Sequence, residues 1–104
     1  MKQALKEIEE SYRSIVKRVK IKPRVGMILG TGLGKLADQV AIRESLSYDD
    51  IPHFPVSTVE GHAGRLLFGR LAGKNVVIMQ GRAHGYEGYS LHRTTLPVRV
   101  MKRL

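Results

Sequence analysis

The sequence contains no cysteine and no long hydrophobic run. Without cysteine, the chain can form neither a disulfide scaffold nor a thiolate metal site. No apolar stretch approaches the roughly 20 residues that a membrane-spanning helix needs, so no membrane partner is expected. The first residues are charged and amphipathic and lack the apolar core of a signal peptide, which predicts a cytoplasmic protein.

Acidic residues are scarce: nine aspartates and glutamates stand against 18 lysines and arginines, giving a net charge of +9. Such an excess is compatible with nucleic-acid binding. However, eight of the basic residues lie within 1–24 and four within 92–104, and no nucleic-acid-binding motif accompanies them. We therefore do not expect a nucleic-acid partner, because attraction for phosphorylated or acidic small molecules explains the charge equally well.

At 104 residues with 42% hydrophobic residues, the chain is predicted to form one globular unit with a modest core. A helix is expected first, ended by Pro23. Its apolar stripe comprises Leu5, Ile8, Tyr12, Ile15 and Val19. Residues 25–29 are predicted to form a buried strand, and a second helix is expected after Gly34.

The rest of the pattern predicts strands, a long loop and a final helix. Residues 41–48 are expected to form a strand and 51–64 a loop rich in proline and glycine. Residues 65–71 and 75–79 are predicted to pair as a hairpin around Ala72-Gly73-Lys74. Ser90 would cap a helix through Leu104, bent or restarted at Pro97. The expected class is α/β, a mixed sheet flanked by helices.

The stretch "QGRAHGYEGY", residues 80–89, directly follows the apolar run Val76-Val77-Ile78-Met79. It places Arg82 and His84 on a glycine-rich turn beside two tyrosines. Arginine offers a planar fork of donors suited to phosphate, and glycine lets the backbone approach a ligand closely. This mixture favours an anion held beside an aromatic ring.

Strand pairing would bring three glycine-containing loops together. In an antiparallel hairpin, residues 61–65 neighbour residues 81–84. If strand 25–29 runs parallel to strand 75–79, residues 30–34 open at the same edge, where open α/β sheets bind their ligands. The chemically active residues of these loops are Thr31, His62, Arg65, Arg82 and His84. The sequence therefore predicts a phosphate site at this edge.

Single motifs are less specific than this combination. "GTGLGK" has Lys35 where a Rossmann fingerprint needs glycine, and its spacing does not fit a P-loop. Taken alone, His62 is better explained as an ordinary loop residue and Arg65 as a solvated strand end. His53 and His92 have no partner in sequence and are expected to be structural. The four histidines show no metal-ligand spacing, so no metal site is expected.

In order and spacing, "VGMILGTGLG", "IPHFPVSTVEGHAGRLLFGRLAGKNVVIMQGR" and "HGYEGYSLHRTTLPVRV" resemble the N-terminal part of the trimeric purine nucleoside phosphorylases. The resemblance covers residues 25–104 and is weaker before them. It implies a nucleoside phosphorylase-like domain truncated after a helix. Residues 1–24 would be its N-terminal helix and link, and residues 25–104 its phosphate and ribose half-site.

The resemblance implies phosphorolysis of purine (deoxy)ribonucleosides by orthophosphate, to free base and (deoxy)ribose 1-phosphate, in a homotrimer. It requires neither a metal nor an organic cofactor, since orthophosphate is a co-substrate. The family's phosphate-binding residues correspond to Thr31, His62, Arg82 and His84, and the two histidines would be catalytic. The remaining carry-overs are Tyr86 for the ribose and Glu87, Gly30 and Gly32 in support.

The family's base-recognising residues correspond to positions beyond Leu104. We therefore expect the isolated chain not to turn over nucleoside, and its exposed sheet edge to favour association. A related phosphorylase acting on xanthosine or methylthioadenosine remains an alternative, because the residues present do not select the base. A phosphate-binding module without catalysis is the other alternative.

Overall fold

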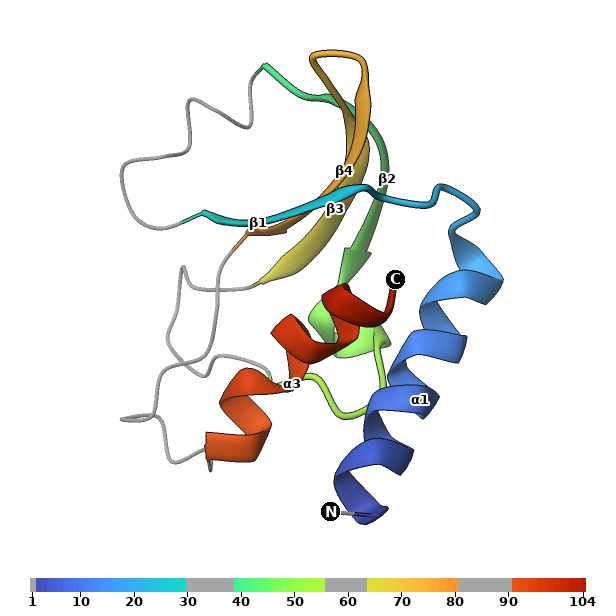
Figure 1. Cartoon of the computed structure of the whole chain (residues 1–104), viewed down its shortest axis with the longest axis vertical. Coiled ribbons are helices and arrows are strands. Elements are labelled where there is room, and N and C mark those ends of the chain that lie inside the picture. Colours follow the sequence, from blue (N-terminus) through green and yellow to red (C-terminus); the bar gives the residue numbers. More distant parts are fainter. Residues whose placement is uncertain (1, 30–38, 56–63, 81–90) are drawn as a thin grey trace.

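The computed structural model describes residues 2–29, 39–55, 64–80 and 91–104. The elements, in chain order, are α1 (Lys2–Arg18), β1 (Val25–Leu29), β2 (Ala41–Ser47), the short 3₁₀ helix η1 (Tyr48–Asp50), β3 (Arg65–Leu71), β4 (Lys74–Gln80) and α3 (Leu91–Arg103). Figure 1 shows both long helices on the same side of a twisted sheet. Within the described part of the chain, neither of them is long and apolar enough to cross a membrane.

The sheet has four strands in the order β1-β4-β3-β2. β1 runs parallel to β4, whereas β3 is antiparallel to both β4 and β2. The ladder between β2 and β3 is irregular between Ile42 and Glu44, the site of a register shift. The predicted α/β class with a mixed sheet is confirmed, as are the strands expected at 25–29 and 41–48 and the hairpin.

A two-residue turn joins β3 to β4. Both of its residues lie in the left-handed region, Ala72 with φ 53° and Gly73 with φ 81°. Two positive φ values are typical of a type I′ turn, whose twist matches that of the strands it connects. Lys74 therefore belongs to β4, paired with Leu71, rather than to the turn as predicted from the sequence.

The two central strands are buried on both faces, which explains their unbroken apolar runs. On one face β3 contributes Leu66 and Phe68 to a core that also holds Ile15 of α1 and Leu96 of α3. On the other face Leu67 packs with a smaller cluster. That cluster comprises Val40, Val76 and Ile78, with Met27 and Leu71 packed against it.

Two expectations about α1 need correction. α1 ends at Arg18, well before Pro23, although the amide of Val19 still donates to the Ile15 carbonyl at 2.9 Å. Leu5 is 60% exposed, because the N-terminal end of α1 lies away from the sheet (Figure 1). Ile15, by contrast, is fully buried.

β1 is less buried than predicted because it is an edge strand. Val25 is 43% and Ile28 38% exposed. α3 is one continuous helix through Pro97, so of the two predicted effects of this proline, a bend or a restart, the restart is absent. The Pro97 ring is fully buried, and packing therefore holds it in the helix despite its missing amide donor.

Candidate functional site

Three strand ends meet at one edge of the sheet. The register pairs Leu29, the last residue of β1, with Gln80, the last residue of β4. It also pairs Gln80 with Arg65, the first residue of β3. Figure 1 shows these ends side by side. The predicted antiparallel hairpin is therefore confirmed, and the parallel pairing on which the predicted convergence depended is present.

The expected ligand-binding side chains themselves lie outside the described residues. These are Thr31, His62, Arg82, His84, Tyr86 and Glu87, together with Gly30 and Gly32. The helix expected after Gly34 and the Ser90 cap also fall outside them, apart from the turn at residues 39–40 that leads into β2. The roles of all these residues stay predictions, whereas the strand ends to which their segments attach are fixed.

Arg65 is the one residue of the predicted convergence that the structure describes. Its side chain is exposed, and its Nε donates to Oε1 of Gln80 at 2.7 Å. Arg65 is therefore a solvated strand end that links β3 to β4 at the candidate edge. This agrees with the simpler interpretation of Arg65 from the sequence.

Gly64, which precedes β3, lies too close to Tyr48 for any side chain. An added Cβ would overlap carbon atoms of the Tyr48 ring, and the Gly64 carbonyl accepts a hydrogen bond from the Tyr48 amide at 3.1 Å. The ring is 3% exposed and packs edge-on against Phe54, with centroids 5.4 Å apart. Burial also raises the pKa of the Tyr48 hydroxyl. The backbone two residues after His62 is thus anchored on the core.

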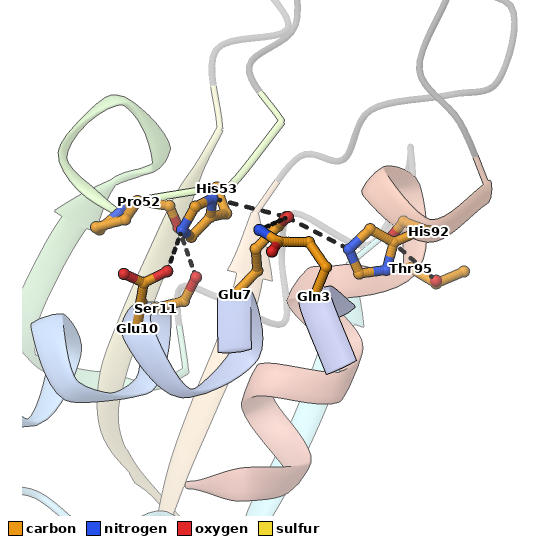
Figure 2. Close-up of polar contacts among 8 residues, drawn as sticks. All are labelled: Gln3, Glu7, Glu10, Ser11, Pro52, His53, His92 and Thr95. Atoms are coloured by element: carbon orange, nitrogen blue, oxygen red, sulfur yellow. Dashed lines mark hydrogen bonds and ion pairs between the residues drawn. The ribbon is translucent and has the colours of Figure 1, made fainter. Parts of the chain in front are cut away.

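A polar cluster that was not predicted from the sequence is centred on Glu7. Figure 2 shows it between α1, the turn at residues 51–55 and the first turn of α3. Glu7 is only 8% exposed. Its Oε1 lies 3.4 Å from His92 Nε2 and 3.6 Å from His53 Nδ1. Its Oε2 accepts a hydrogen bond from Gln3 at 3.1 Å. The expectation that both histidines are structural is consistent with these contacts.

A second contact joins α1 to the same turn. Ser11 is fully buried, and its hydroxyl donates to the Pro52 carbonyl at 2.5 Å. The sequence carries one signal of this arrangement, since Gln3, Glu7 and Ser11 recur every four residues and therefore share a helix face. Nothing in the sequence, however, indicates that His53 and His92 are the residues opposite that face.

The cluster holds its histidines by direct contact with carboxylates. His53 Nε2 lies 3.1 Å from Glu10 Oε1, while its Nδ1 faces Glu7. Among the residues that the structure describes, no group of three or more histidine, aspartate or glutamate side chains is arranged to hold a metal ion. The contacts of Glu7 with His53 and His92 link α1 to the turn at residues 51–55 and to α3.

The fold defines a class, because it matches the fold of nucleoside phosphorylase structures. More specifically, over nearly its whole length the chain is similar to purine nucleoside phosphorylases. Purine nucleoside phosphorylase 1 of Geobacillus stearothermophilus is 54% identical over 97 residues, which cover 93% of this chain and 35% of the relative. The Anopheles gambiae purine nucleoside phosphorylase is 53% identical over 94 residues, covering 90% of this chain and 27% of that one.

Solved structures give the same result. The Schistosoma mansoni purine nucleoside phosphorylase in complex with acetate matches with a TM-score of 0.87 and 47% identity, over 95% of this chain and 36% of its own. A purine nucleoside phosphorylase in complex with ribose-1-phosphate matches with a TM-score of 0.85, 48% identity and the same coverage. No protein-family model matches the chain. The chain thus spans about a third of the length of the relatives it matches.

Proposed function

We propose that the chain forms the phosphate- and ribose-binding part of a purine nucleoside phosphorylase. The observation that carries this proposal is the register that sets Leu29, Gln80 and Arg65 side by side. Each of these strand ends adjoins a segment whose residues suit an oxyanion or a sugar. Sequence identity of 54% to a bacterial purine nucleoside phosphorylase supports the same assignment.

In this proposal phosphate is held by the Thr31 hydroxyl, the Arg82 guanidinium and the imidazoles of His62 and His84. Binding orients phosphate below the anomeric carbon of the nucleoside, which removes much of the entropic cost of a reaction between two molecules. A phosphate oxygen then bonds to that carbon as the bond to the purine nitrogen breaks, with its electron pair leaving on the base. Positive charge that develops on the sugar is stabilised by the bound phosphate.

The remaining assignments follow from the resemblance. Tyr86 would contact the ribose, and Glu87, Gly30 and Gly32 would support the phosphate site. No metal or organic cofactor takes part. Structures of the Schistosoma mansoni enzyme contain inosine or adenosine, and a structure of a schistosoma purine nucleoside phosphorylase contains hypoxanthine, which supports purine nucleosides as substrates here. The protein would act in the cytoplasm as a homotrimer.

The first test measures phosphate binding by the 104-residue chain with isothermal titration calorimetry. Arg82→Ala is expected to weaken binding about tenfold or more, because a hydrogen bond to a charged group contributes about 1.5 to 3 kcal/mol. Arg43→Ala is the matched control, since it removes the same charge from the opposite edge strand, β2, where the side chain is exposed. Equal losses in the two variants would show that the attraction is general electrostatics.

The second test measures phosphate-dependent release of hypoxanthine from inosine. The chain alone is expected to show no turnover. A chimera that joins residue 104 to the remaining part of the Geobacillus stearothermophilus relative is expected to be active and to lose activity with Arg82→Ala. A folded chimera that binds nucleoside but shows no phosphorolysis would contradict the proposed function.

A further inference from the structure

We infer that Glu7 is a positioning residue for the phosphate site, an inference that rests on the proposed function. Its buried carboxylate joins the two described segments next to the stretches expected to bind phosphate. His53 lies in the turn that precedes residues 56–63, which include His62. His92 lies in the first turn of α3, directly after residues 81–90, which include Arg82 and His84.

The geometry places one carboxylate between two imidazoles that are far apart in the sequence. Figure 2 shows His53 and His92 reaching Glu7 from opposite sides. Both contacts converge on Oε1, at 3.6 Å and 3.4 Å, while Gln3 contacts Oε2. A carboxylate that is 8% exposed has lost most of its hydration, so it requires donors of this kind. Glu7 therefore favours a fixed separation between the two segments.

The turn that carries His53 depends on its contacts with α1. His53 has φ 68°, a left-handed conformation that is unfavourable for a residue with a side chain. Three contacts hold this turn against the helix: Ser11 with the Pro52 carbonyl, Glu7 with His53 Nδ1 and Glu10 with His53 Nε2. Residues 56–63 thus start from a turn fixed by α1 and end at Gly64, which is fixed by Tyr48.

Anchored segment ends bear on affinity, because phosphate binding needs donors from separate segments to meet at one point. Binding is stronger when those donors are held in place before the ligand arrives, since less conformational entropy is then lost. Among the residues that the structure describes next to those segments, Glu7 contacts His53 and His92, and it would act through them. Its loss is therefore expected to lower phosphate affinity in a chain that still folds.

The test is a phosphate titration of the 104-residue chain followed by NMR through the histidine ring signals. Glu7→Gln retains the shape of the side chain and removes its charge. We expect its phosphate affinity to fall about fivefold, and the ring signals of His53 and His92 to shift before phosphate is added. Glu9→Gln is the matched control on the same helix, because Glu9 contacts Arg13 and Arg103 instead. Its affinity is expected to stay within about twofold of the wild type.

A second pair of variants separates positioning from stability and decides the matter if Glu7→Gln does not fold. His92→Gln retains a donor near the position of Nε2, and His92→Leu removes it. We expect the glutamine variant to retain phosphate affinity and the leucine variant to lose about fivefold, each measured on chain shown to be folded by its amide spectrum. A merely structural role would lower the free energy of unfolding and leave the affinity of the folded chain unchanged.

The outcomes distinguish this inference from the proposed function. If the wild-type chain binds no phosphate, the half-site and the positioning role both fail. If the wild type binds phosphate with Arg82-dependent affinity, but Glu7→Gln and His92→Leu bind equally well, the positioning role alone is wrong.

Discussion

Replacing Gly64 with alanine is expected to destabilise the chain, because the new methyl group has no space. The added Cβ would overlap Cδ2, Cε2 and Cζ of Tyr48. Tyr48 cannot move aside easily, since its ring is 3% exposed and packs edge-on against Phe54 at an interplanar angle of 61°. The backbone of Gly64 is held as well, through the hydrogen bond to the Tyr48 amide. Relief of the overlap must therefore shift either the core or the start of β3.

The size of the effect follows from two opposing contributions. Overpacking a well-packed core costs about 1 to 3 kcal/mol, and a rigid buried ring places this case near 3. Alanine also restricts the unfolded chain relative to glycine, which offsets about 0.4 to 1 kcal/mol. The net loss in the free energy of unfolding is thus about 2 kcal/mol, which corresponds to a decrease in Tm of about 10 °C for a domain of this size.

The assay is urea unfolding of the purified chain, followed by circular dichroism. Gly26→Ala is the matched control, because its added Cβ would lie 3.8 Å from the nearest atoms, which belong to the Met101 and Val77 side chains. That is ordinary van der Waals contact, and the change is expected to stay within about 0.5 kcal/mol. Combining Gly64→Ala with Tyr48→Leu should cost less than the sum of the two single changes. Equal losses for Gly64→Ala and Gly26→Ala would refute the steric explanation.

Two further stability predictions use the same urea assay. Ile15→Ala is expected to lower the free energy of unfolding by about 2 to 5 kcal/mol, because it leaves a cavity in place of a fully buried side chain. Leu5→Ala, on the same predicted stripe, should lower it by less than about 0.5 kcal/mol, because Leu5 is 60% exposed. Similar losses at both positions would contradict the described placement of α1. Ala72→Asn is expected to raise the free energy of unfolding by about 0.5 kcal/mol, because asparagine tolerates the positive φ of the first residue in a type I′ turn. A loss of stability would show that the turn has another geometry.

The sheet could be predicted from the sequence because its signals are local or follow from strand pairing. The apolar run of β3, which ends at Leu71, lies before a short turn with glycine, and the apolar run of β4, which ends at Gln80, lies after it. A connection this short requires antiparallel strands. Val25–Leu29 is followed by a long connection, which permits the parallel pairing with β4 that the structure shows. Once these two pairings are known, the meeting of three strand ends at one edge follows without further information.

Burial along the helices and at the sheet edges could not be predicted in the same way. The spacing of Leu5 and Ile15 is equally helical, and only the position of the sheet along α1 separates an exposed residue from a buried one. Pro23 likewise sets only an outer limit for the helix, which ends at Arg18 although Val19 is still buried in the core. The cluster around Glu7 was missed because periodicity identifies a polar helix face but not the residues that contact it.

Gly64 shows why a glycine-rich motif should not be assigned wholly to its ligand. The motif "GHAGR" lies in one of the glycine-containing loops predicted to meet at the phosphate site, yet at Gly64 the close approach is that of Tyr48. The backbone on both sides of residues 56–63 is anchored. After them, Gly64 accepts a hydrogen bond from the Tyr48 amide; before them, the turn at residues 52–53 is held by Ser11 and Glu7. If His62 contacts phosphate as proposed, its position is set largely by core residues that never touch the ligand. Substitutions at these anchors should then change phosphate affinity while every proposed ligand-binding residue remains in the chain.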